Sequence, residues 1–189
     1  EIGSGLVGSE MCIRDRYKGF PVICNLSRLS VKRKDKEMRV LTPSERESLI
    51  GILMEDMDSF KFGVFLALYT GIRIGELCAL QWKDIDFARA TLKVRKTIQR
   101  IQNIDRQAVS KTKIVISVPK SKCSIREIPL SVSVMDIAQN FISYPESYVL
   151  TGTSRYIEPR TMQNHFKLYV KQSGISDANF HALRHTFAT

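Results

Sequence analysis

The spacing of apolar residues changes twice along this 189-residue chain, and this limits the folds that it can adopt. Over residues 59–70 the apolar side chains recur near helical spacing, which predicts a helix. Ile114, Ile116 and Val118 then occupy every second position, as in a strand with one buried face. Helical spacing returns from about Val134 onward. The sequence therefore predicts an α+β fold that is mainly helical and contains one small sheet.

Start and stop signals help to place the helices. Thr42-Pro43-Ser44-Glu45 form a capping box with proline at the first helical position, so a helix is expected to begin here. Gly71 stands where a glycine often ends a helix, directly after residues 59–70, and Gly174 has the same place after residues 161–172. The remaining helices are expected around residues 74–78, over residues 134–141, and from about Phe180.

Three segments have the alternation of strands. They cover residues 92–98, 114–118 and 125–130, and a long turn around residues 103–108 separates the first two. We expect them to form one three-stranded antiparallel sheet.

Two N-terminal segments do not look like part of this fold. Residues 1–16 have no clear apolar period and resemble the translation of a sequencing adaptor, so we expect a non-native segment; a natural disordered terminus is the alternative. Residues 17–41 are rich in lysine and arginine, which is typical of a solvated linker and, beside a DNA-binding domain, of a segment along phosphates. The folded domain is expected over residues 42–189.

The net charge indicates a polyanionic partner. The chain has 29 Lys and Arg against 19 Asp and Glu, a formal charge of +10, which favours nucleic acid first and an anionic membrane surface second. No apolar run approaches the roughly 20 residues of a membrane span. The four cysteines are scattered without a C-x-x-C pair, so neither a zinc site nor a disulfide framework is expected. These features, without a visible signal peptide, predict a cytoplasmic protein.

Arg73 follows the glycine at the end of one expected helix and stands at the start of the next. A helix N-terminus offers free backbone amides to an anion, and arginine binds phosphate with a planar, always charged fork. Glu76, three residues on, can hold the guanidinium. For this segment taken alone, an ordinary surface ion pair is the favoured alternative.

His181 and Arg184 are three residues apart, so they project from one face of the last expected helix. An arginine neutralises charge that develops on phosphodiester oxygens, and a histidine exchanges a proton near neutral pH. Leu183 faces elsewhere and is expected to anchor the helix in the core. A helix with two ordinary histidines, His181 and His185, is the alternative.

Lys120 and Lys122 lie in a turn between two expected strands. A lysine on a hairpin tip can reach into a DNA groove, or protonate a leaving alkoxide where its neighbours lower its pKa. A solvated basic turn is the commoner arrangement.

Four motifs in this order resemble the tyrosine recombinase family, above all the integrases of phages and conjugative transposons. They are T-G-x-R-x-G-E-L (residues 70–77), L-x-W-x-D-I-D (residues 80–86), a P-K-x-K turn (residues 119–122) and H-x-L-R-H-T-F-A-T (residues 181–189). The resemblance covers residues 42–189. It implies the catalytic-domain fold of that family, incomplete at its C-terminal end and without the N-terminal core-binding domain.

The resemblance also implies a mechanism. In this family a tyrosine hydroxyl attacks a DNA phosphodiester, forms a 3′-phosphotyrosyl enzyme and frees a 5′-hydroxyl that attacks the partner duplex. No cofactor and no metal ion are expected, because the covalent bond preserves the phosphoester. The partner is double-stranded DNA, on which family members assemble as tetramers.

Motif positions assign the site residues. By this correspondence Arg73 and Arg184 clamp the scissile phosphate, His181 donates a hydrogen bond or carries a proton, and Lys120 is the general acid. Lys122 competes with Lys120 for that role. The residues expected to support these groups from behind are Glu76 and His185, and Trp82 is expected in the core.

The nucleophilic tyrosine is expected outside this sequence. The family places a Gly-His box and the tyrosine after the H-x-L-R box, whereas all six tyrosines here precede it. We therefore expect a gene fragment that does not cleave DNA alone. A non-enzymatic DNA-binding module, such as an excision or regulatory factor, explains the charge but not the paired arginine motifs. A type IB topoisomerase shares the chemistry but fits the motifs less well.

Overall fold

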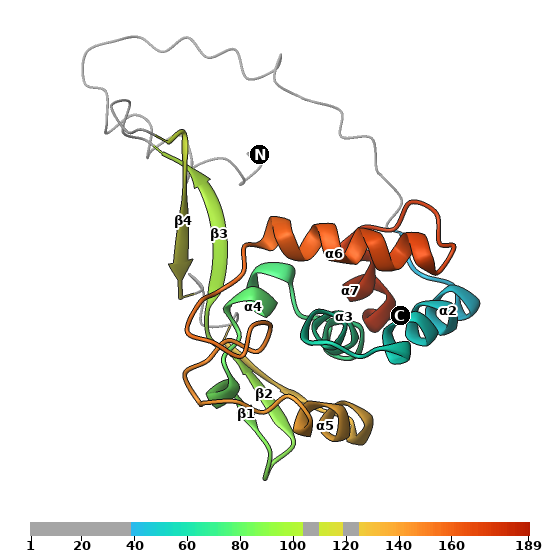
Figure 1. Ribbon diagram of the computed structural model, residues 1–189, viewed down its shortest axis with the longest axis horizontal. Coiled ribbons are helices and arrows are strands. Elements are labelled where there is room, and N and C mark those ends of the chain that lie inside the picture. Colours follow the sequence, from blue (N-terminus) through green and yellow to red (C-terminus); the bar gives the residue numbers. More distant parts are fainter. Residues whose placement is uncertain (1–38, 104–109, 119–124) are drawn as a thin grey trace, which may run out of the picture. The chain divides into compact units, whose positions relative to one another are not determined.

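The computed structural model describes residues 39–103, 110–118 and 125–189 (Figure 1). They belong to one compact unit that extends over residues 38–189. The unit includes residues before Thr42: Leu41 is buried, and its backbone N–H donates to Thr186 Oγ1 at 3.0 Å. This bond joins the beginning of the folded unit to its last helix. Lys120 and Lys122 lie outside the described residues.

The first two helices begin where the sequence predicts, and the second also ends there. Helix α2 (Pro43–Glu55) starts at the capping box, in which Thr42 Oγ1 accepts from the Glu45 N–H and the Glu45 carboxylate accepts from the Thr42 N–H. Helix α3 (Ser59–Thr70) ends at Gly71, whose left-handed backbone (φ 61°) any other residue would adopt only with strain.

The remaining helices also confirm the predicted order. They are α4 (Ile74–Ala79), α5 (Val132–Gln139), α6 (Pro159–Gln172) and α7 (Phe180–Ala188); the 3₁₀ turn η2 (Trp82–Asp84), which the sequence analysis did not predict, follows α4. Helices α5 and α6 each begin two residues earlier than their apolar spacing indicated. Ser131 caps α5 by accepting from the Val134 N–H, and Pro159 opens α6 at a position where no backbone donor is needed.

The strands form a three-stranded antiparallel sheet and a separate hairpin. The sheet has the order β1 (Ile85–Asp86), β2 (Thr91–Val94), β5 (Arg126–Pro129). The hairpin consists of β3 (Thr97–Gln102) and β4 (Thr112–Ser117). The three expected strand segments are therefore present, but residues 114–118 do not belong to the three-stranded sheet, whose third member is β1.

The difference arises at Arg95 and Lys96, which interrupt the segment expected as one strand. Arg95 lies 3.6 Å from the buried carboxylate of Asp84, and Lys96 contacts the Gln81 side chain. The chain before this break pairs with β5 and the chain after it pairs with β4. Alternation specifies which face of a strand is buried but not which strand lies beside it, so the sequence pattern did not reveal the change of partner.

Helix α3 lies at the centre of the core and packs against α2, α5, α6 and α7. Its residues Phe62 and Leu66 are fully buried, as are Phe166 of α6 and Leu183 of α7. Trp82 is 4% exposed and stacks near Phe62, as expected for a core residue. Within the described part of the chain, no helix combines the length and the apolar character that crossing a membrane requires.

Candidate active site

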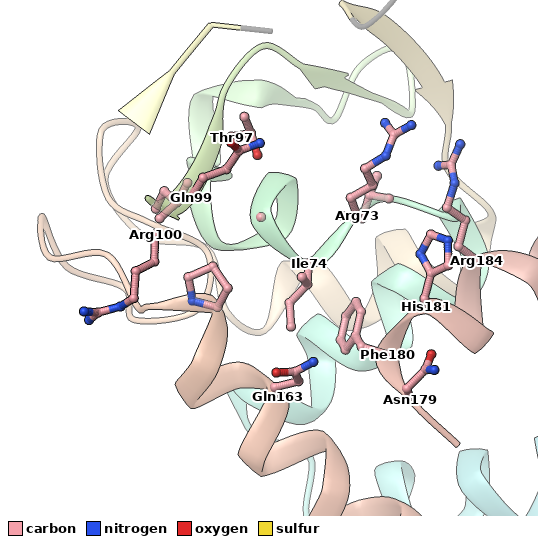
Figure 2. Close-up of a pocket in the computed structure, with 14 residues that line it drawn as sticks. Arg73, Ile74, Thr97, Gln99, Arg100, Gln163, Asn179, Phe180, His181 and Arg184 are labelled. Atoms are coloured by element: carbon pink, nitrogen blue, oxygen red, sulfur yellow. The ribbon is translucent and has the colours of Figure 1, made fainter. Parts of the chain in front are cut away.

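A cavity of about 680 Å³ opens where the start of α4, strand β3, and helices α6 and α7 meet (Figure 2). Three of the four residues assigned from the motifs line it. These are Arg73, His181 and Arg184. In Figure 2 their side chains lie on the same side of the cavity, and the two guanidinium groups point in the same direction. Residues more than one hundred positions apart in sequence are thus brought into one site.

The turn between α3 and α4 positions Arg73. After Gly71 the chain is extended, and Arg73 is the N-cap of α4 (φ −77°, ψ 151°) rather than a residue inside it. Gly75 lets α4 approach β3, since a Cβ atom there would lie 2.6 Å from the Ile98 carbonyl oxygen. The side chain of Arg73 remains 54% exposed and faces the cavity.

Helix α7 supplies His181 and Arg184 from one face, because the two residues are three positions apart. Asn179 caps the helix by accepting from the Ala182 N–H at 3.1 Å. The Arg184 guanidinium donates a hydrogen bond to the Gly71 carbonyl oxygen, 113 residues away in sequence. This bond fixes α7 to the turn that carries Arg73.

The buried carboxylate of Glu76 binds both Arg73 and Arg126. It is only 5% exposed, and its carboxylate accepts from the Arg73 guanidinium at 3.0 Å and from both terminal nitrogens of Arg126 at 3.1 and 2.8 Å. Burial raises the pKa of Glu76, but the hydrogen bonds from Arg126 and from the Arg73 backbone outweigh it, so the pKa lies below its ordinary value. The carboxylate is therefore charged at neutral pH.

Positive charge is concentrated around His181. Its pKa is lowered by partial burial and by the neighbouring His185, Arg184 and Arg73. The rings of His181 and His185 meet edge to face, with centroids 4.5 Å apart. The pKa of Arg184 is also lowered, first by burial and then by the charge of Arg73. An anion between these groups would relieve their repulsion, so the site is suited to a phosphate.

The cavity is also lined by Arg100 and Gln163, which lie across it from His181, and by Asn179 beside His181; the sequence analysis singled out none of them. Arg100 donates to Thr112 Oγ1 at 2.7 Å and pairs with Glu158 at 2.5 Å, which connects the β3–β4 hairpin to the start of α6. Arg126 was also not assigned a role. The sequence could have indicated this role, because Arg126 shares a strand face with the buried Ile128, and an arginine on a buried face requires a carboxylate partner.

The connection that contains Lys120 and Lys122 lies outside the described residues, so their position stays a prediction. The described residues on either side of it are close to the site: Ser117 pairs with Thr97, which lines the cavity, and Arg126 binds Glu76. The strands that it joins belong to different sheets. Strands β4 and β5 are therefore not paired with each other as the two arms of one hairpin.

Both residues that were expected to support the site contact one of its members. His185 is half-buried with its ring against that of His181, and Glu76 accepts a hydrogen bond from the Arg73 guanidinium. Across residues 39–103, 110–118 and 125–189, no three His, Cys, Asp or Glu side chains are grouped as metal ligands.

Residues 39–189 match the phage integrase family model. A tyrosine recombinase XerC-like protein of Caldanaerobacter subterraneus subsp. tengcongensis is 30% identical over 141 residues, which cover 66% of this chain and 36% of that protein. The ICEBs1 integrase of Bacillus subtilis is 25% identical over 175 residues, which cover 86% of this chain and 45% of the relative. The chain spans less than half the length of these two relatives.

Solved structures show the same fold. The Tn1549 transposon integrase, in complex with transposon right end DNA, superposes with a TM-score of 0.65 at 23% identity over 95% of this chain and 61% of that chain. A lambda integrase dimer bound to a COC′ core site gives a TM-score of 0.53 at 19% identity, over 95% of this chain and 60% of that chain. The family match over residues 39–189, together with this fold, shows that the chain belongs to the phage integrase family of tyrosine recombinases.

Proposed function

We propose that this chain is the catalytic domain of an integrase that carries out site-specific recombination of double-stranded DNA through a 3′-phosphotyrosyl intermediate. The observation that supports it most is the joint placement of Arg73, His181 and Arg184 in one cavity. The protein acts in the cytoplasm and assembles as a tetramer on its DNA sites. The net charge of +10 favours such a partner.

In this proposal the two arginines bind the scissile phosphate. Arg73 and Arg184 present charged, planar donors from α4 and α7 to the same space, as a phosphodiester with charge developing on its oxygens requires. His181 lies beside them and donates a hydrogen bond or carries a proton. Its lowered pKa favours the neutral form in the free site, and a bound phosphate would raise that pKa.

Lys120 remains the proposed general acid for the 5′-oxygen, with Lys122 as its competitor. Two observations support this. The lysines match the sequence motif, and the described residues next to the segment that contains them lie near the site, since Ser117 pairs with the cavity-lining Thr97 and Arg126 binds Glu76. Substituting each lysine separately distinguishes them, because a 5′-bridging phosphorothioate leaving group needs no proton and would rescue cleavage only in the variant that lacks the true acid.

The nucleophile is proposed to be none of the six tyrosines in this sequence. All six precede His181 in sequence, and no described tyrosine lines the cavity. Burial and the charge of Asp58 raise the pKa of Tyr169 to about 12, which opposes formation of a nucleophilic phenolate. We therefore propose that the 189-residue chain alone does not cleave DNA.

The test uses the coding sequence that flanks this chain in its source DNA, and a nicked suicide duplex from the junctions of the mobile element. The extended protein is expected to form a covalent adduct with DNA. Arg73→Ala and Arg184→Ala should each lower the rate of adduct formation by about 10²–10³-fold, as losing a transition-state donor does, while DNA contact largely persists. Arg89→Ala is the matched control, because Arg89 is 74% exposed and does not line the cavity.

The competing function is a non-enzymatic DNA-binding module. It predicts that no adduct forms with any flanking sequence, and that the arginine substitutions change DNA affinity alone. A frame that supplies no tyrosine after the H-x-L-R box, with no adduct on suicide DNA, would refute the proposed function.

A further inference from the structure

We propose that Arg126 is a positioning residue for Arg73 and acts on it through the buried carboxylate of Glu76. The inference rests on the proposed function, in which Arg73 binds the scissile phosphate.

The geometry of this group is a carboxylate between two arginines. Arg126 Nη1 donates to Glu76 Oε1 at 3.1 Å, and Arg126 Nη2 donates to Glu76 Oε2 at 2.8 Å. Arg73 Nη1 donates to Oε1 at 3.0 Å, and the Arg73 backbone N–H donates to Oε2 at 2.9 Å. Both carboxylate oxygens are thus shared between the two arginines.

The three side chains of this group differ in their exposure to solvent. The side chain of Glu76 is 4% exposed, that of Arg126 is 26% exposed, and that of Arg73 is 54% exposed and faces the cavity. The less exposed Arg126 binds the carboxylate in a bidentate manner, whereas Arg73 donates to it from only one of its terminal nitrogens. Among the described residues, no bond engages the other guanidinium nitrogens of Arg73, which leaves them for a phosphate.

Arg126 is needed because a buried carboxylate attracts whichever guanidinium is available. If Arg126 were absent, Glu76 would be left with Arg73, and the favourable arrangement of such a pair is bidentate and neutral. Arg73 would then turn its fork toward Glu76 and away from the cavity. With Arg126 in place, the carboxylate is already satisfied and Arg73 keeps its outward orientation.

The charge of the group supports the same conclusion. One carboxylate against Arg73 and Arg126 leaves a formal charge of +1, whereas Glu76 and Arg73 alone would be neutral. Arg126 also adds to the positive surroundings of Arg184, since its charge contributes to lowering the Arg184 pKa. Arg126 therefore maintains the positive charge at the cavity without lining it.

Arg126 is itself held in place by the three-stranded sheet. It lies on β5, where it is paired with Val94 of β2, and it shares a strand face with Ile128, which is 8% exposed. Glu76 and Arg73 belong to α4 and its N-cap. The contact thus ties the arginine at the cavity to the three-stranded sheet.

A double-mutant cycle on the complete 189-residue chain tests this. Binding of a short duplex of mixed sequence is measured by fluorescence anisotropy at several salt concentrations for the wild type, Arg73→Gln, Arg126→Gln and the double variant. Each phosphate contact contributes about 0.9 to the slope of log K against log salt. Each single substitution is expected to reduce the slope by about that amount, and the double variant by no more than a single one.

Two further variants separate positioning from other effects. Arg126→Lys keeps the positive charge but cannot hold both oxygens in a fork, so its slope should fall as in Arg126→Gln. Lys93→Gln removes a charge from the same sheet, where Lys93 pairs with Glu127 at 2.9 Å, and it should show no coupling to Arg73. Thermal unfolding by circular dichroism establishes that each variant is folded, and Arg126→Lys replaces Arg126→Gln in the cycle if the latter is not.

The outcomes are distinct. Additive losses in the double variant would mean that Arg126 contacts DNA directly. An unchanged slope in Arg126→Lys would mean that only its charge matters. Either result would overturn this inference but not the proposed function. If Arg73→Gln itself leaves the slope unchanged, the phosphate role of Arg73 fails, and both the proposed function and this inference fail with it.

Discussion

Arg184 donates a hydrogen bond from its guanidinium to the carbonyl oxygen of Gly71, and so joins the last described helix to the turn that carries Arg73. The same turn packs under α7, because a Cβ atom at Gly71 would lie 2.5 Å from the ring of Phe187. The two arginines of the candidate site are therefore connected by the backbone of one turn.

Gly71→Ala should lower the free energy of unfolding by about 1–3 kcal/mol, the range expected for a non-glycine residue held in a strained backbone conformation. The added methyl group would also displace Phe187. Gly51→Ala, in the interior of α2, is the matched control, because nothing lies within 4 Å of its Cβ position. This control should be stabilised by about 0.5–1 kcal/mol. Urea unfolding measures both; equal effects in the two variants would contradict the assignment of strain to Gly71.

Glu76 should contribute to the acid sensitivity of the fold. Its folded pKa lies below the ordinary value of a glutamate, so its contribution to stability is present above that ordinary value and is lost as the pH falls through the folded pKa. Glu76→Gln is expected to be less stable than wild type at pH 7 and to lose less stability between pH 5 and pH 3. Glu127→Gln, at a glutamate that is 54% exposed, is the control. Parallel pH profiles of wild type and Glu76→Gln in denaturant unfolding would refute this.

Duplex DNA should bind the chain weakly and with a strong dependence on salt, because contacts with phosphates dominate the affinity of a surface of this charge. A plot of log K against log salt is expected to be linear, with a slope whose size reflects the number of phosphates bound. Arg184→Gln should reduce the slope by about 0.9, the contribution of one phosphate. Affinity that stays constant from low to moderate salt would exclude an electrostatic interface.

The chain alone should form no covalent complex with DNA. A nicked suicide duplex traps a phosphotyrosyl adduct, which denaturing gel electrophoresis resolves from free protein. The expected result is no adduct from the 189-residue chain and an adduct from the extended protein. An adduct formed by the chain itself would show that one of its six tyrosines is the nucleophile, and peptide mapping would identify it.

The sequence by itself determined the helices, because the information for them is local. The capping box at Thr42, the glycine at position 71 and the apolar spacing of residues 59–70 each act within a few residues, and all three were confirmed. The arginine motifs were equally readable, since Arg73 and Arg184 lie in short segments with fixed spacing.

Only the tertiary structure decided which strands pair and which charges meet. The break at Arg95 and Lys96 gives β2 and β3 different partners, and the alternation of apolar residues carries no information about a partner. The contact between Arg126 and Glu76 spans 50 residues, and the bond from Arg184 to Gly71 spans 113. Such contacts depend on where the whole chain places its elements, so local spacing alone did not predict them.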